Sequence, residues 1–345
     1  MDPGIVLKVE GTNADVGRCI GTRFRHRILV ATEETVGQLS SAGIDRATLA
    51  ARQAPYLERV EESLPHLLDE LRNLAEAAAA PFEVVFFLNA GGLRTASREY
   101  LAQLEVRGEN GCTSVGSRGD RGIVVGHNED AAPECIDDLF LLDATVSSAS
   151  TGSQVRFAGL SYAYNLPGCA ASRNQHGLTL LVDTLVDPQP GIGVPCDFLT
   201  RAILEHESID SAIEFLRRVQ RSGAASLTLA QDDRLTSIEL TSSELAVIED
   251  REYLVHTNHF LVPELQLRAL APTTESSARL ARAQSLVRRG MTPDEMKQLL
   301  SDRAGGPYDI CRTRTIASFV ARTNVPGFEF CVGSPDQAEW SHWHI

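Results

Sequence analysis

The segment Asn110-Gly111-Cys112-Thr113-Ser114 carries the strongest indication of fold and chemistry in this 345-residue chain. The Cys112 thiol is placed to attack the Gly111 carbonyl and convert the peptide bond to a thioester, which water then hydrolyses. Glycine suits this step because it tolerates strained dihedral angles and leaves its carbonyl unobstructed. Cleavage would free an α-amine with a pKa near ~7.7, able to take a proton near neutral pH. Cys112 would then supply both nucleophile and base, although a Gly-Cys pair by itself is more typical of a buried structural thiol.

Composition limits the partners of this chain. The 345 residues are enough for one large domain or two ordinary ones, and the hydrophobic fraction of 43% with 6% aromatic residues is ordinary for a globular protein. The formal net charge of −14 argues against nucleic acid and against an anionic membrane surface as partners. We therefore expect a small-molecule substrate.

Targeting and redox signals give no indication of secretion. No apolar run reaches the ~18 residues needed to span a bilayer, and the sequence start has no signal-peptide pattern. The seven cysteines are odd in number, widely spaced and without a Cys-x-x-Cys pair, so neither a disulfide framework nor a zinc ribbon is indicated. The cytoplasm is the expected location.

Hydrophobic periodicity predicts an α+β protein. Leucines at helical spacing run from Arg46 to Ala80, and Pro65 and Pro81 are expected to divide and end this helical stretch. Further helices are predicted at 197–206, 210–221, 276–288 and 293–301, and β-rich runs at 122–126, 154–163, 177–186, 225–229, 236–240 and 253–256. No repeat or linker divides the chain, and residues 186–193 are interpreted as a loop near the site.

Six short segments occur in an order that identifies a family. They are Gly111-Cys112-Thr113, Gly126-His127-Asn128-Glu129-Asp130, Asn174-Gln175-His176-Gly177-Leu178, Gly193-Val194-Pro195, His256-Thr257-Asn258-His259 and Ile310-Cys311-Arg312. Together they resemble the penicillin acyltransferase family of N-terminal nucleophile hydrolases. The resemblance covers the chain from about Cys112 to the C-terminus.

The resemblance has definite implications. It implies a four-layer αββα sandwich in a single domain, 1–345, cut between Gly111 and Cys112. The products are an α-chain (1–111) and a β-chain (112–345), which form a heterodimer. No cofactor is expected. The family role of Asp130 is to hold the active-site groups in place near the amine of the nucleophile.

Asn258 is the candidate for the oxyanion hole, because a side-chain amide can donate a hydrogen bond where charge develops on a tetrahedral intermediate. His256 and His259 flank it. Two histidines at this spacing are too few to bind zinc, so we interpret them as packing or hydrogen-bonding residues and expect no metal. Arg312 is predicted either to bind a substrate carboxylate or to form a structural salt bridge.

Glu129 is the candidate specificity residue, and His127 and Asn128 are weaker candidates for substrate binding. The penicillin enzymes of the family carry tryptophan at the position of Glu129. A carboxylate facing the pocket would suit a cationic acyl group, which resembles the branch that hydrolyses β-alanyl amides of biogenic amines. If its side chain points away, Glu129 is a solvated charge at a strand end.

These inferences favour a self-processing amidohydrolase that cleaves a small N-acyl amide through an acyl-enzyme on Cys112. The close second is an acyltransferase that moves an acyl group from a thioester or amide to an amine. An unprocessed ligand-binding protein would share the same motifs without catalysing a reaction. A thiol enzyme with an intact chain would instead need His127 or His256 within hydrogen-bond reach of Cys112.

Overall fold

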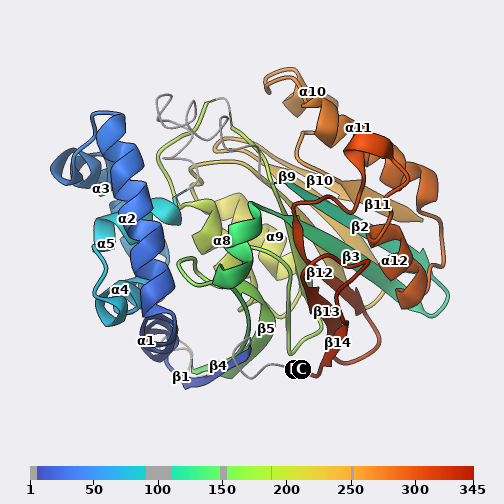
Figure 1. The fold of residues 1–345 in the computed structure, drawn as a ribbon, viewed down its shortest axis with the longest axis horizontal. Helices are drawn as coiled ribbons and strands as arrows, with labels where there is room; N and C mark the ends of the chain where they lie inside the picture. The colour runs from blue at the N-terminus through green and yellow to red at the C-terminus, as the bar shows by residue number, and fades with distance from the viewer. Residues whose placement is uncertain (1–5, 91–110, 148–153, 188, 250–251) are drawn as a thin grey trace.

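Two β-sheets lie face to face between two layers of helices (Figure 1). The computed structural model describes residues 6–90, 111–147, 154–187, 189–249 and 252–345. None of the helices in these ranges is long and apolar enough to cross a bilayer.

The larger sheet has eight strands in the order β1-β4-β5-β6-β7-β8-β9-β10. β1 pairs with β4 in parallel, and the other neighbours are antiparallel. The strands are β1 (Val6–Gly11), β4 (Leu139–Ser147), β5 (Gln154–Tyr162), β6 (Ser172–Asn174), β7 (Thr179–Thr184), β8 (Ala225–Gln231), β9 (Arg234–Leu240) and β10 (Leu245–Glu249).

The smaller sheet has six antiparallel strands in the order β11-β2-β3-β12-β13-β14. Its strands are β2 (Gly111–Gly119), β3 (Gly122–Asp130), β11 (Tyr253–His256), β12 (Thr315–Arg322), β13 (Phe328–Val332) and β14 (Ser341–Trp343). The hairpin of β2 and β3 carries the Gly111-Cys112-Thr113 motif on its first strand and the motif of residues 126–130 on its second.

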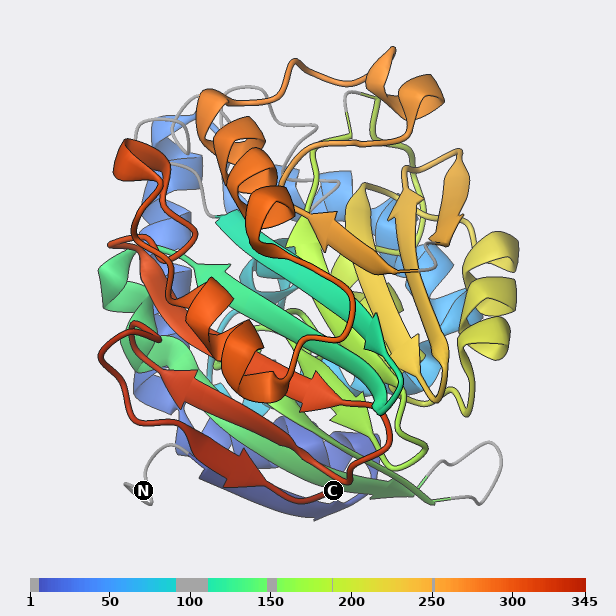
Figure 2. The same ribbon diagram turned by 90° about the vertical axis from the view of Figure 1, so that its right-hand side faces the viewer.

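Helices cover the outer face of each sheet (Figure 2). The larger sheet is covered by α1 (Asn13–Arg23), α2 (Arg25–Ser41), α3 (Arg46–Ser63), α4 (Pro65–Ala78), α5 (Phe82–Leu88), α8 (Cys196–Ile203) and α9 (Ile209–Arg218). The smaller sheet is covered by α11 (Thr274–Leu286) and α12 (Pro293–Leu300). The short α10 (Pro263–Gln266) packs with Leu185 and Phe260.

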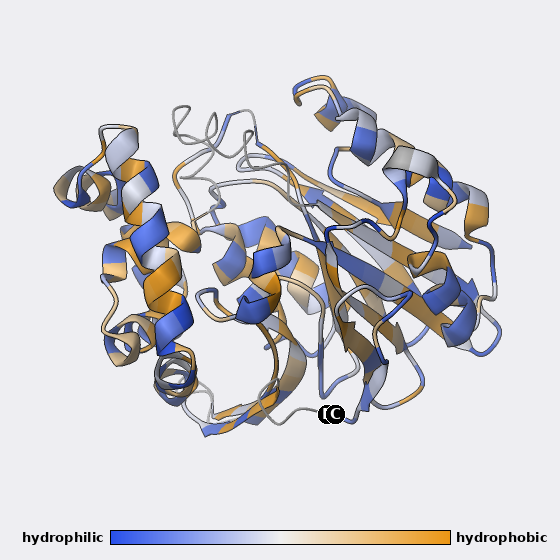
Figure 3. Cartoon of the chain, viewed as in Figure 1, coloured by the Kyte–Doolittle hydropathy of each residue, from blue (hydrophilic) through white to orange (hydrophobic). Residues whose placement is uncertain are grey.

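Three apolar clusters fill the spaces between the four layers, and apolar residues (orange in Figure 3) occur in the strands of both sheets. Leu71 of α4 and Leu142 of β4 belong to the first cluster. Leu141 points to the other face of β4 and joins Phe319 of β12 between the sheets. Met296 of α12 lies in the third cluster, against the smaller sheet. This arrangement confirms the predicted αββα sandwich.

The predicted helices and strands match the structure where the apolar period is clear. Pro65 is the first residue of α4, so the leucine-rich stretch divides where expected. The pattern did not predict α1, α2 and α10, nor β1, β2, β4, β6, β10 and β12 to β14. The apolar run Phe82–Leu88 is the short helix α5, with every residue from Val84 to Leu88 buried.

Candidate active site

The register of the β2–β3 hairpin gathers four polar side chains on one face of the smaller sheet. Cys112 lies opposite Glu129, and Ser114 lies opposite His127. Because side chains alternate along a strand, all four point the same way, into the space between the two sheets. Gly116, next in this series, confirms the direction, since a Cβ there would contact Leu235 of the larger sheet.

Hydrogen bonds join these side chains into a buried network around the thiol. The Cys112 Sγ, in a residue only 5% exposed, donates to Glu129 Oε2 at 3.7 Å. The same oxygen contacts His127 Nε2 at 3.0 Å, and Tyr162 of β5 donates to Oε1 at 2.9 Å. His127 Nδ1 lies 3.0 Å from the Ser114 hydroxyl. Glu129 therefore faces the thiol and is not a solvated strand-end charge.

The electrostatics of this network keep the thiol protonated. Burial raises the pKa of Cys112 well above its usual value, and the charges of Glu129 and Asp183 raise it further. Burial alone would lower the pKa of His127, but its hydrogen bond to Glu129 and the charge of Glu129 outweigh this, so the His127 pKa is raised. Reaction at Cys112 therefore requires a base to remove the thiol proton.

A second set of contacts holds the backbone of Cys112 from the other side. Its N–H donates to Asn258 Oδ1 at 2.9 Å. Arg279 of α11, 2% exposed, donates to the same Oδ1 at 2.7 Å, to Thr113 Oγ1 at 2.8 Å and to the Cys112 carbonyl. Asn258 Nδ2 donates to the Thr184 carbonyl at 3.2 Å. Since an amide nitrogen carries two N–H groups, Asn258 keeps a second donor for a substrate oxygen.

Gly111 has little room for a side chain. A Cβ at this position would lie 3.0 Å from Arg279 Nη2, 3.0 Å from Arg312 Nη1 and 3.2 Å from Asn258 Oδ1. The residue before Cys112 thus sits against two guanidinium groups, which a side chain would displace.

Asp130 and Asn128 point to the opposite face of β3, toward the outer helices. Asp130 accepts from Thr315 Oγ1 at 2.6 Å and from Arg312 Nη1 at 3.4 Å. Burial raises its pKa, and Arg279 partly offsets this. Asn128 donates to the carbonyls of Leu300 and Ile310, which makes it a bridge to α12 and its following loop. Among the described residues, the hydrogen-bond acceptor of the Cys112 nitrogen is Asn258 and not Asp130.

His256 and His259 form hydrogen bonds with protein groups close to Asn258. His256 Nε2 lies 2.9 Å from Glu239 Oε1, and its Nδ1 contacts the Thr257 carbonyl. His259 Nδ1 lies 2.7 Å from Ser276 Oγ, which accepts the Asn258 N–H at 2.9 Å. The contacts of both histidines are thus with protein groups, which lie on different segments of the chain.

Arg312 forms ion pairs with Asp130 and Glu275, the arrangement of a structural salt bridge. It reaches the site indirectly, through Asp130 and through its closeness to Gly111. The loop predicted near the site, residues 186–193, comes soon after Thr184, whose carbonyl accepts a hydrogen bond from Asn258. Pro188 of this loop lies outside the described residues.

Four residues of the site were missed from the sequence: Ser114, Tyr162, Asp183 and Arg279. Two of them carried a signal. Asp183 ends the apolar run Leu180-Leu181-Val182 and yet is fully buried. Arg279 lies three residues after Ser276 on the buried face of an amphipathic helix, where an arginine is unexpected.

The donor atoms of Cys112, His127 and Glu129 lie within 4.8 Å of one another, a spacing compatible with a metal ion. The hydrogen bonds of Glu129 with Cys112 and His127 account for the same spacing without a metal ion. His127 is therefore near the thiol, but its hydrogen bond is to Glu129. The direct Cys-His pair of an intact-chain thiol enzyme is not formed by His127 or by His256.

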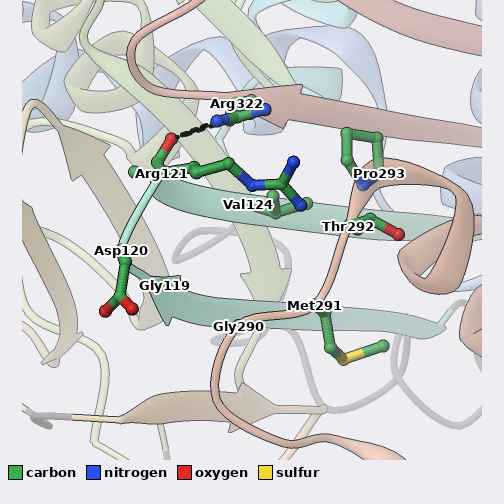
Figure 4. A pocket seen from close by; sticks show the side chains of 10 residues that line it. Gly119, Asp120, Arg121, Val124, Gly290, Met291, Thr292, Pro293 and Arg322 are labelled. Atoms are coloured by element: carbon green, nitrogen blue, oxygen red, sulfur yellow. Dashed lines mark hydrogen bonds between the residues drawn. The ribbon is translucent and has the colours of Figure 1, made fainter.

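A separate pocket of about 170 Å³ lies at the β2–β3 turn, lined in part by Asp120, Arg121, Met291 and Arg322 (Figure 4). Cys112 is at the other end of β2, about 25 Å away at ~3.3 Å per residue. This pocket is too far from Cys112 to be part of the site around its thiol.

Two packed sheets between helical layers, with a cysteine at the start of a central strand, are the arrangement expected for the N-terminal nucleophile hydrolase fold. A family model described as acyl-coenzyme A:6-aminopenicillanic acid acyl-transferase matches residues 117–337. This is more than half of the chain, and the chain belongs to that family. It is therefore an enzyme of the hydrolase and acyltransferase class.

Individual proteins with similarity to the chain include β-alanyl-dopamine/carcinine hydrolase of Drosophila melanogaster, 24% identical over 360 residues that cover 93% of this chain and 89% of that protein. Similar solved structures include penicillin V acylase from Agrobacterium tumefaciens, with a TM-score of 0.47, 14% identity and coverage of 68% of this chain and 86% of that one. A variant of conjugated bile acid hydrolase from Clostridium perfringens has a TM-score of 0.43, 12% identity and coverage of 68% and 97%.

Proposed function

We propose that this enzyme cleaves itself between Gly111 and Cys112 and then hydrolyses a small N-acyl amide through an acyl-enzyme on Cys112. The observation that carries the proposal is that the sulfur and the nitrogen of Cys112 each have a hydrogen-bond partner in the site. The Cys112 thiol is bound to Glu129, while the Cys112 nitrogen is bound to Asn258. A structural cysteine needs neither contact.

Self-cleavage needs a base other than the Cys112 nitrogen, because that nitrogen is still part of an amide. Glu129 is the group in position, since its Oε2 already accepts the thiol hydrogen at 3.7 Å. The thiolate attacks the Gly111 carbonyl carbon, the bond from that carbon to the Cys112 nitrogen breaks, and the nitrogen takes up a proton. Water then hydrolyses the Gly111 thioester and restores the thiol.

After cleavage the Cys112 nitrogen becomes an α-amine that can stay on Asn258 Oδ1 and accept the thiol proton. The thiolate adds to the substrate carbonyl, and the second N–H of Asn258 with a backbone N–H stabilises the oxyanion. The amine product leaves with a proton, and water hydrolyses the acyl-enzyme. Residues 1–111 stay associated with residues 112–345, because α1 to α5 pack on the larger sheet.

The acyl group is proposed to carry a positive charge. The relative from Drosophila acts on β-alanyl-dopamine and carcinine by its name, and the space around Cys112 is lined by the carboxylates of Glu129 and Asp183. Acyl transfer to an amine is the second candidate. It uses the same acyl-enzyme and differs in whether water or an amine attacks it.

The first test is the intact mass of the wild-type protein beside Cys112→Ala. Scaling 37.5 kDa by 111/345 and 234/345 gives expected fragments of about 12 and 25 kDa for the wild type. The variant should remain one chain. An intact wild type that still turns over amides would replace self-processing with an internal-cysteine mechanism, and an intact, inactive one would favour a ligand-binding protein.

A further inference from the structure

A second buried carboxylate, Asp183, faces the same space as the thiol but takes no part in the chemistry described above. It lies on β7, where Leu180 and Val182 face the outer helices and Leu181 faces the space between the sheets. By alternation, Asp183 points inward with Leu181. Its side chain is fully buried, and Asp183 Oδ2 lies 3.9 Å from His256 Nδ1.

Asp183 differs from the other carboxylates of the site in its hydrogen bonds. Neither of its oxygens has a hydrogen-bond partner at normal distance in the part of the chain that the structure describes. The Ser114 hydroxyl lowers the Asp183 pKa, but it has a single hydrogen to donate and also contacts His127 Nδ1 at 3.0 Å, so it can satisfy at most one acceptor position of the carboxylate. By contrast, Glu129 is bonded by Cys112, His127 and Tyr162.

An unpartnered buried carboxylate is costly, because removing the group from water is not offset by hydrogen bonds. Burial accordingly raises the Asp183 pKa, although His256 and His127 oppose the shift. His256 already binds Glu239, and His127 already binds Glu129. The carboxylate thus retains unused acceptor positions directed into the space beside the nucleophile, which is where a ligand with cationic N–H donors would satisfy them.

We propose that Asp183 binds a primary ammonium group in the acyl part of the substrate and so selects amino-acyl amides over neutral ones. The inference rests on the proposed amidohydrolase function and adds the residue that determines its specificity. An ammonium with three donors forms charge-assisted hydrogen bonds with the free oxygens of Asp183 while the acyl carbonyl lies at Cys112. Glu129 keeps its role as the base for self-cleavage, so the two carboxylates have separate functions.

The test is Asp183→Asn, which keeps the shape of the side chain and removes its charge. Two amides with the same amine leaving group are compared, one with a β-alanyl and one with a propionyl group, which differ by the ammonium alone. We expect kcat/KM for the β-alanyl amide to fall at least about thirtyfold, the change that corresponds to about 2 kcal/mol for a buried charge pair. The ratio of kcat/KM for the β-alanyl amide to kcat/KM for the propionyl amide should fall by the same factor, because any effect of Asp183 on the Cys112 thiol is common to both amides.

Glu129→Gln is the matched comparison, measured per mole of cleaved chain. It should change kcat/KM for the two amides by the same factor, because Glu129 contacts the thiol and is not assigned to the ammonium. Equal losses on both amides in Asp183→Asn, or no loss, would overturn the proposal. A loss confined to the β-alanyl amide in Glu129→Gln instead would assign the ammonium to Glu129.

A binding measurement separates this proposal from the catalytic one. Calorimetry with β-alaninamide and propionamide on the wild-type protein requires no turnover. Tighter binding of β-alaninamide by about tenfold or more, lost in Asp183→Asn, supports the ammonium site even if no amide is hydrolysed. Equal binding of the two amides to the wild type overturns it, whether or not the variant folds. Failure of the proposed function would show instead as an intact wild-type chain that hydrolyses neither amide.

Discussion

Asn258 is assigned two roles that a single substitution can separate. Its Oδ1 accepts from the Cys112 nitrogen at 2.9 Å and from Arg279 at 2.7 Å, whereas its Nδ2 is the donor proposed for the oxyanion. Asn258→Asp keeps an oxygen in the accepting position and loses both N–H groups. Asn258→Ala loses the acceptor as well.

The expected magnitude follows from the missing donor. Removing one oxyanion-hole donor typically lowers kcat by about 10²–10³, or about 2.7–4 kcal/mol of transition-state stabilisation. The new carboxylate lies beside Arg279, whose charge limits its repulsion of the oxyanion. We therefore expect kcat to fall by about 10²–10³ in Asn258→Asp, and somewhat further in Asn258→Ala, because the Cys112 amine then loses its acceptor.

The assay is single-turnover and steady-state hydrolysis of a β-alanyl amide, with the rate expressed per mole of chain already cleaved at Gly111. Intact mass gives that cleaved fraction for each protein. If Asn258→Asp keeps kcat within about threefold of wild type while Asn258→Ala loses it, Asn258 is a positioning acceptor and the oxyanion donor must be sought elsewhere. If both variants retain kcat, neither role is correct.

Three further outcomes are expected. Glu129→Gln should slow self-cleavage by about 10² or more, as for loss of a general base, and an unchanged time course of intact mass would show that Glu129 is not that base. Glu70→Leu should lower the free energy of unfolding by about 3–5 kcal/mol, because it leaves the fully buried Arg201 without its main partner; denaturant titration should show most of this recovered in the double variant Glu70→Leu/Arg201→Met. Although burial opposes the shift, Arg201 and His66 outweigh it and lower the pKa of Glu205 to about 2. The carboxylate therefore contributes about 3 kcal/mol to the free energy of unfolding above pH ~5, and this contribution is lost as the pH falls toward 2. Glu205→Gln should show less acid destabilisation than wild type over that range.

The sequence predicted the parts of the fold whose burial repeats along a single element. The leucines of α3 and α4 recur at helical spacing and contact one continuous cluster, and Pro65 occupies the first turn of α4, where proline is favoured. β2 was missed because Gly-Cys-Thr-Ser-Val-Gly-Ser has no apolar alternation. Both of its faces are buried, and the inner one carries polar side chains. The strand that holds Cys112 thus lacks the apolar pattern by which strands are recognised.

The site divides in the same way. Cys112 and Asn258 were predicted because each lies in a short motif, but the positions of Asp183 and Arg279 beside Cys112 became clear only with the fold. Asp183 faces the space beside the thiol from the larger sheet, and Arg279 binds the Cys112 carbonyl from a helix on the opposite face of β2. Both positions depend on strand register and layer packing, which no local spacing in the sequence encodes.

The position of Asn258 links the two reactions that Cys112 is proposed to carry out. The nitrogen of Cys112 cannot accept a proton while it is an amide, and it can once the bond to Gly111 is broken. Asn258 Oδ1 binds this nitrogen before cleavage and is in place to bind it afterwards. Glu129 therefore need serve as base only until the amine exists. The same contacts that align Cys112 for cleavage then leave its amine beside its thiol, so maturation can change the base without moving the nucleophile.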